Sequence, residues 1–160
     1  MTQVAASGLM VRKEITVEAS QTRAFNVFTQ EQGAWWPLAT HHIGAAAAET
    51  AIIEPRVGGR WFERGGDGSE CDWGRVLVWD PPGRLVLAWE ISADWKHDQA
   101  IETEVEIRFV ALGPALTRVE LEHRQLDHYG PAAEQMRGIF DSEGGWTGIL
   151  RLFAGRARDA

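Results

Sequence analysis

The stretch that decides the fold is residues 101–124, which read IETEVEIRFVALGPALTRVELEHR. Apolar and charged side chains alternate on both sides of the turn at Gly113-Pro114. The apolar set consists of Val105, Ile107, Phe109, Val119 and Leu121. A period of two is typical of strands with one buried and one solvated face. We therefore predict two neighbouring antiparallel strands, 101–111 and 117–124, whose charged rows share one water-facing surface.

The residues before this stretch continue as short strands separated by turn residues. Expected strands cover 11–19, 50–56, 60–64, 69–79 and 84–92. Gly65-Gly66-Asp67-Gly68 is a hairpin loop, and Asp80-Pro81-Pro82-Gly83 is a turn with a preset proline. A helix over 21–31 begins at Ser20, which is a good N-cap residue. Serial hairpins with short connections predict an antiparallel meander rather than a parallel sheet.

The last thirty residues have the spacing of a helix with one apolar stripe. The stripe comprises Met136, Ile139, Phe140, Glu143, Trp146, Leu150, Phe153 and Ala157. Gly144-Gly145 interrupts it, so the helix either bends there or lies close to a neighbouring backbone. This helix is expected to close the single buried face of a curved sheet.

Length and composition indicate a globular protein. The 160 residues form about one domain, with a flexible N-terminus at 1–10 and a single domain at 11–158. The net charge of −7 argues against nucleic-acid binding. No apolar run is long enough to span a membrane, and no basic start marks a secretory signal, so we expect a cytoplasmic protein. The single Cys71 excludes an internal disulfide.

Motifs along the chain resemble those of a known superfamily. In order they are EPRVGGRWFE at 54–63, WGRV at 73–76, WDPP at 79–82, LVLAW at 85–89, TEVE at 103–106, TRVELEH at 117–123 and GGW at 144–146. Over residues 11 to 156 the chain resembles the START-like (SRPBCC) superfamily. The closer likeness is to its bacterial branch, related to the C-terminal domain of the heat-shock-protein-90 ATPase activator. The resemblance implies an α+β helix-grip fold: a curved antiparallel sheet of about seven strands wrapped around a long C-terminal helix, with an apolar pocket between them.

Strand parity indicates which side chains point into that pocket. Residues of one strand that we place on a common inward face are Cys71, Trp73, Arg75, Leu77 and Trp79. The predicted ligand-binding residues are Trp36, Trp61, Glu63, Trp73, Arg75, Trp89, His123, Phe140, Glu143 and Trp146. A single bulge would invert an assignment, and the polar members could instead pair with one another.

The chemistry-bearing residues form no recognised catalytic or metal-binding pattern. Glu143 and His123 would be the acid–base pair of an enzyme, but no nucleophile accompanies them, and we assign no catalytic residue. The histidines and Cys71 lack paired metal-ligand spacing, so neither a metal nor another cofactor is expected.

Two loops are candidates for the mouth of the pocket. Trp35-Trp36-Pro37 and the small residues up to Ala48 could form a lid or a partner surface, and Trp95–Gln99 is a second candidate for the rim. Simple packing of these loops onto the sheet is the alternative interpretation.

Three classes of function follow from these observations. We favour a binding protein for a small apolar or aromatic ligand, because the interior is aromatic and no catalytic signature is present. A cavity enzyme of the cyclase or hydratase type and a chaperone-interacting module are the alternatives. A homodimer is left open.

Overall fold

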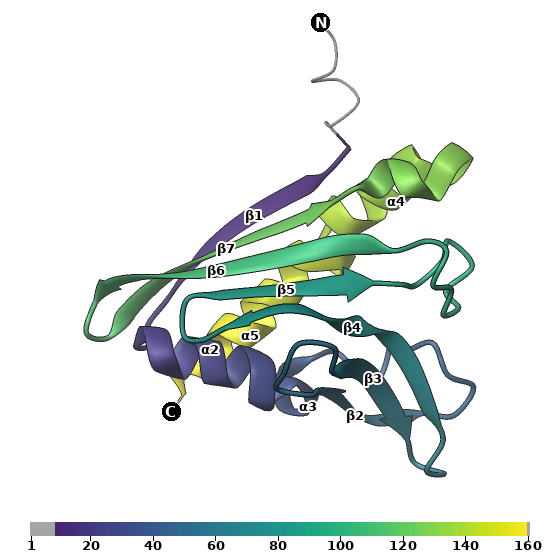
Figure 1. Ribbon diagram of the computed structural model, residues 1–160. Coiled ribbons are helices and arrows are strands. Elements are labelled where there is room, and N and C mark those ends of the chain that lie inside the picture. Colours follow the sequence, from purple (N-terminus) through teal and green to yellow (C-terminus); the bar gives the residue numbers. More distant parts are fainter. Residues whose placement is uncertain (1–8, 160) are drawn as a thin grey trace, which may run out of the picture.

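The computed structural model describes residues 9–159, which form one seven-stranded antiparallel sheet (Figure 1). The strand order is β1-β7-β6-β5-β4-β3-β2. The strands are β1 Val11–Val17, β2 Ala48–Ile53, β3 Arg60–Gly65, β4 Glu70–Asp80, β5 Arg84–Trp89, β6 Thr103–Gly113 and β7 Leu116–Arg124. Consecutive strands from β2 to β7 are neighbours, so the predicted meander is confirmed. The first eight residues of the predicted flexible N-terminus lie outside the described residues.

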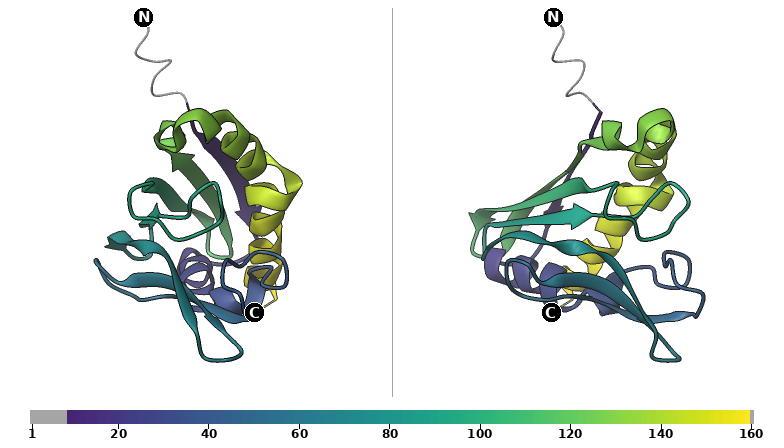
Figure 2. Two further views of the ribbon diagram at one scale, coloured as in Figure 1. Left: turned by 90° about the vertical axis from the view of Figure 1, so that its right-hand side faces the viewer. Right: turned by 45° about the vertical axis from the view of Figure 1, so that its right-hand side comes forward.

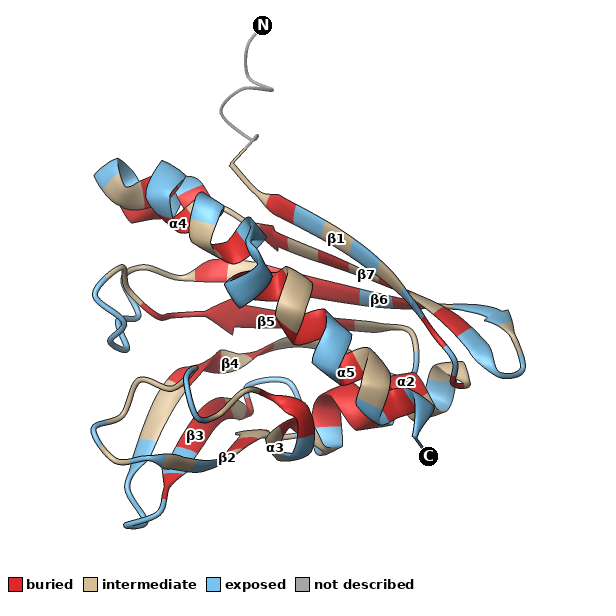
Figure 3. Ribbon diagram, turned by 180° about the vertical axis from the view of Figure 1, so that it is seen from behind, coloured by how far each residue is buried: buried red, intermediate tan, exposed pale blue. Residues whose placement is uncertain are grey.

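Helices cover one face of this sheet. They are α2 Gln21–Gln30, α3 Gln32–Trp35, the 3₁₀ segment η1 Leu126–Ala132, α4 Ala133–Asp141, the π turn η2 Glu143–Thr147 and α5 Gly148–Arg158. The sheet curls around the path of α4 and α5 (Figure 2), and the buried side of both helices faces the strands (Figure 3). The helix-grip fold class is therefore confirmed. Within residues 9–159, no helix is both long and apolar enough to cross a membrane.

The N-terminal helix α2 starts where the sequence predicts. The Ser20 side chain accepts a hydrogen bond from the Arg23 backbone N–H at 3.1 Å, which caps the first turn. Its buried face, which includes Phe25 and Phe28, packs on the sheet and on Phe153 of α5. This packing closes the narrow end of the molecule.

The predicted pairing of β6 with β7 is confirmed. Ile107 lies opposite Leu121 and Phe109 opposite Val119, and all four side chains are buried. On the other face, one arginine forms ion pairs with three carboxylates: Arg124 with Glu104, Glu106 and Glu122. Burial raises the pKa of Glu106, but hydrogen bonds from Arg124 and Arg84 outweigh it and hold that pKa below its usual value.

Two bulges in β4 overturn part of the predicted parity. The register slips once at Trp73 against β3 and again at Leu77 against β5. Each bulge adds one residue and moves the following side chains to the opposite face. Trp73, Val76 and Trp79 consequently point inward at intervals of three, whereas the inward placement of Arg75 and Leu77 is wrong.

The C-terminal helix is broken rather than continuous. Gly145 adopts φ −99° and ψ −139°, which is outside the helical region. A Cβ at this position would lie 2.4 Å from the carbonyl oxygens of both Ile139 and Phe140. Thus the helix bends at Gly145, and the backbone at this residue also lies close to the backbone of the preceding turn. The break carries Glu143 out to solvent, where it pairs with Arg151 at 3.0 Å, so its predicted place in the buried stripe is wrong.

Candidate functional site

A cavity of about 430 Å³ lies between the sheet and the C-terminal helical segment and opens to solvent. Its walls come from β4 and β5, from α4 through α5, and from two loops. The first loop, called the rim loop here, is residues 37–47, and the second is residues 90–102. The lining residues are Trp36, Thr40, His41, His42, Ile43, Trp73, Trp89, Ile91, Trp95, Ile139, Phe140, Gly144, Gly145, Trp146 and Ile149.

Five aromatic side chains form most of the inner wall. Trp73 and Trp89 come from the sheet and Phe140 and Trp146 from the helical segment, while Trp36 immediately precedes the rim loop. The Trp36 and Trp73 ring centroids are 5.1 Å apart, and those of Trp89 and Phe140 are 5.3 Å apart. Such contacts fix each ring against its neighbours, so the wall is built before any ligand enters.

The indole N–H groups of this wall are already used by the protein. Trp36 donates to the His41 carbonyl oxygen at 3.1 Å and Trp73 to the Glu63 carboxylate at 2.8 Å. Trp89 donates to the hydroxyl of Tyr129 at 3.1 Å, and that hydroxyl donates in turn to a backbone carbonyl oxygen. Each of these indoles therefore offers carbon and π surface to the cavity rather than a hydrogen-bond donor.

His123 lies directly behind the wall and holds the fourth indole. The N–H of Trp146 donates to His123 Nδ1 at 3.1 Å, so Nδ1 carries no proton. The proton is on Nε2, which lies 2.8 Å from the hydroxyl of Thr103. Burial lowers the pKa of His123 to about 3, so the ring is neutral at physiological pH. A neutral ring with both nitrogens occupied acts as a structural support.

Glu63 secures the rim loop from below. Its side chain is only 2% exposed and accepts hydrogen bonds from the backbone N–H of Ile43 at 2.6 Å and of Gly44 at 3.0 Å, besides the bond from Trp73. Three N–H donors compensate the carboxylate for lost water. The same residue thus fixes one wall indole and two consecutive residues of the rim loop.

Two histidines supply the polar part of the cavity mouth. His41 is fully engaged: Nε2 donates to the Gly144 carbonyl oxygen at 2.6 Å, and Nδ1 lies 2.7 Å from the Thr40 hydroxyl. This contact ties the rim loop to the break in the helix. His42 donates from Nδ1 to the Gly44 carbonyl oxygen at 3.0 Å.

Tyr129, whose hydroxyl accepts the indole N–H of Trp89, lies close to the wall, and burial raises the pKa of its hydroxyl.

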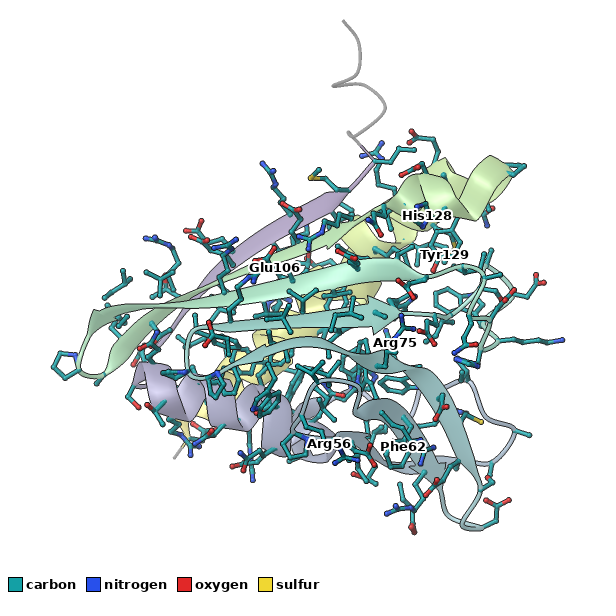
Figure 4. The ribbon with its side chains drawn as sticks, viewed as in Figure 1. Arg56, Phe62, Arg75, Glu106, His128 and Tyr129 are labelled. Atoms are coloured by element: carbon teal, nitrogen blue, oxygen red, sulfur yellow. The ribbon has the colours of Figure 1, made fainter. Side chains whose placement is uncertain are left out.

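The structure divides the predicted site residues into three groups. Lining the cavity are Trp36, Trp73, Trp89, Phe140 and Trp146. Buried behind the lining are Trp61, Glu63 and His123. Away from it are Glu143, which is exposed, and Arg75 on the outer face, where it pairs with Glu90 and with Glu102 at 2.7 Å (Figure 4).

The loop that the sequence marks as a candidate lid supplies most of the rim, but beyond Trp36 none of its residues is among the predicted ligand-binding residues. Thr40, His41, His42 and Ile43 line the cavity although strand parity and helix periodicity say nothing about them. The available signal was the Trp35-Trp36-Pro37 motif, after which the chain must leave the helix and cross the open side of the sheet. Trp95 likewise lies in the second loop that the sequence marks as a rim candidate.

Together the fold and the cavity define a helix-grip protein with a cavity between the curved sheet and its last helical segment. The model of the family "Activator of Hsp90 ATPase homolog 1-like protein" matches residues 18–157, and the chain belongs to this family, within the START-like (SRPBCC) superfamily. No curated protein matches the sequence.

Solved structures extend this assignment. An anthrahydroquino-γ-pyrone synthase, Txn09, is 38% identical, with 91% of this chain and 95% of that chain covered and a TM-score of 0.65. The self-sacrificing resistance protein CalC from Micromonospora echinospora is 29% identical, with 94% of each chain covered and a TM-score of 0.68.

An Hsp90 activator from Plasmodium falciparum, 14% identical over 92% of this chain and 97% of that chain with a TM-score of 0.61, shares the fold. The family and fold are consistent with ligand binding, and the enzyme and chaperone-module alternatives are compatible with them as well.

Proposed function

We propose that this protein binds a flat aromatic small molecule in the cavity between β4, β5 and the C-terminal helical segment. One observation carries the proposal: four indoles and one phenyl ring form most of the inner wall, and the N–H groups of these four indoles all hydrogen bond within the protein. A wall of this kind recognises its ligand through ring stacking and apolar contact rather than through donated hydrogen bonds.

The more similar solved structures support an aromatic ligand. The name of the 38% identical synthase describes a fused quinone-derived ring system, and that enzyme covers nearly the whole chain. A cavity of about 430 Å³ falls within the range of small-molecule sites, which is roughly 300–1,000 Å³. We therefore take a polycyclic quinone as the model ligand class.

A cavity enzyme of the cyclase type is the second candidate, and the synthase neighbour is the observation that favours it. The two functions differ in what becomes of the ligand. A binding protein returns its ligand chemically unchanged, whereas a cyclase returns a new ring. Chromatography of a candidate open-chain precursor after incubation with the protein distinguishes them.

The proposal also covers the domain organisation, the cellular location and the oligomeric state of the protein. Residues 11–158 form one domain, since β1 pairs with the last strand, β7, and also contacts α5 at the other end of the domain. The location is cytoplasmic, which suits the free thiol of Cys71. A homodimer stays a prediction that light scattering of the purified protein checks.

The proposal is tested by titrating the protein with 9,10-anthraquinone while recording tryptophan emission and heat. We expect quenching and a negative heat-capacity change, because apolar surface is buried. Phe140→Leu removes one ring of the wall and should weaken binding about fivefold.

Phe62→Leu is the matched control. Phe62 lies on the other face of β3, beneath the Arg60 guanidinium at 3.9 Å, and does not line the cavity (Figure 4). This variant should bind as the wild type does. Unchanged emission and heat on addition of the quinone would contradict the proposed function.

A further inference from the structure

One cavity-lining side chain, His42, combines a fixed tautomer with a free nitrogen. Its Nδ1 lies 3.0 Å from the carbonyl oxygen of Gly44 and 4.0 Å from the Glu63 carboxylate. Both neighbours are acceptors, so Nδ1 must carry the proton. In the neutral ring the lone pair is then on Nε2, to which no group among residues 9–159 hydrogen bonds.

The other histidine at the cavity mouth, His41, has no free ring nitrogen. Both of its nitrogens have protein partners, Gly144 on one side and Thr40 on the other. It therefore has no acceptor left for a ligand. Of the imidazoles that line the cavity, His42 alone has a ring nitrogen without a hydrogen-bond partner within the described part of the chain.

A buried carboxylate lies beside the His42 ring. Glu63 is anchored by the N–H groups of Ile43, Gly44 and Trp73, so its position does not depend on His42. A proton gained at Nε2 makes the ring cationic while its Nδ1–H still faces two acceptors. Glu63 is accordingly a positioning residue for the His42 ring.

We propose that His42 Nε2 accepts the hydrogen of a phenolic hydroxyl on the bound ligand, so that the ligand class is a hydroxylated aromatic ring system rather than a bare arene. This inference rests on the proposed function, because it concerns a ligand of the same cavity. In the complex the phenol O–H bond breaks, its electron pair remains on oxygen as phenolate, and the proton forms the N–H bond at Nε2. The aromatic wall stacks the ring, and His42 selects its substituent.

The test compares 9,10-anthraquinone with 2-hydroxyanthraquinone, which differ only in the hydroxyl group. Wild-type protein should bind the hydroxylated compound about tenfold more tightly, the gain expected of a hydrogen bond with charged character. The bound compound should also show the red-shifted absorption of its phenolate at a pH where the free compound is neutral. A residue that merely supports the loop would not produce this band.

His42→Phe keeps an aromatic ring of similar size but has no nitrogen, so the affinity difference and the phenolate band should both disappear. His128→Gln is the control, since His128 is exposed outside the cavity and should leave both intact. If His42→Phe does not fold, the affinities of the wild-type protein for the two compounds and the phenolate band still test the proposal.

The outcomes separate the two proposals. Equal affinity of the wild type for both compounds, or a phenolate band that persists in His42→Phe, overturns the role of His42 while the proposed function stands. If neither compound binds, both proposals are contradicted.

Discussion

The indole N–H of Trp146 donates a hydrogen bond to Nδ1 of His123 across the core, at 3.1 Å. Trp146 lies in the break of the C-terminal helix and His123 on β7, so this bond joins the most irregular turn to the sheet. Because an indole can only donate, the bond is available only while Nδ1 is unprotonated.

This relationship predicts a loss of stability in weak acid. The His123 pKa is about 3 in the folded chain and near its ordinary 6.5 in the unfolded chain. Between these values the unfolded chain binds a proton that the folded chain does not, so the free energy of unfolding falls as pH falls. Urea unfolding should give about 2 kcal/mol less from this residue at about pH 5 than at about pH 7.5.

His123→Asn checks that assignment. Its amide oxygen still accepts from Trp146 but does not titrate, so this part of the pH dependence should vanish even though overall stability is lower. His128→Gln should retain it. A slope that survives in His123→Asn would place its origin in another group.

Gly145→Ala tests the break in the helix. The added methyl would lie 2.4 Å from two backbone carbonyl oxygens, which cannot move aside as side chains do. We expect the variant to lose about 1–3 kcal/mol in the free energy of unfolding. The measurement is the urea midpoint of unfolding.

Gly138→Ala is the matched control, within the same helical segment. No atom lies within 4 Å of a Cβ placed there, and the residue is in the middle of α4. Alanine should therefore stabilise the chain by about 0.5–1 kcal/mol. Equal effects of the two substitutions would mean that Gly145 is not sterically required.

Glu63→Gln tests the anchoring of the rim loop. The amide has one acceptor oxygen, and its NH₂ group must face at least one of the three N–H donors. We expect a loss of about 1–3 kcal/mol in unfolding free energy. Amide hydrogen exchange should become faster at one of the two residues, because Ile43 and Gly44 bond to different carboxylate oxygens and the amide keeps only one of them.

Glu143→Gln is the same chemical change on an exposed side chain whose one ion pair within residues 9–159 is with Arg151. It should leave both the unfolding midpoint and the exchange rates unchanged. If the two glutamates proved equally sensitive, the anchoring role of Glu63 would be wrong.

Truncation after Gly130 tests whether the chain forms a single domain. It removes buried Met136, Phe140, Trp146, Leu150 and Phe153, which close the apolar face of the sheet. Burial of five such side chains contributes on the order of 10 kcal/mol, comparable with the net stability of a domain. The truncated chain should show no cooperative thermal transition by circular dichroism, and a sharp transition would make the helical segment peripheral.

Local patterns in the sequence were sufficient to predict most strands and the start of the first helix. Alternation in 101–124 predicted the β6–β7 pair, turn residues separated the other strands, and Ser20 marked the start of α2. The sequence also predicted that Trp36, Trp73, Trp89, Phe140 and Trp146 line the cavity, because large apolar side chains are buried between the sheet and the helical segment.

Only the tertiary structure decided where this regularity fails. The bulges in β4 turned Arg75 outward, and the break at Gly145 exposed Glu143. The bulges depend on how β4 pairs with its neighbouring strands, and the break depends on close packing of the backbone around Gly145. Neither kind of contact changes the periodicity of the sequence, so periodicity cannot predict them. The rim loop belongs to the same class: His42 gains its free nitrogen and its carboxylate neighbour only because Glu63, twenty-one residues further along the chain, is folded beneath it.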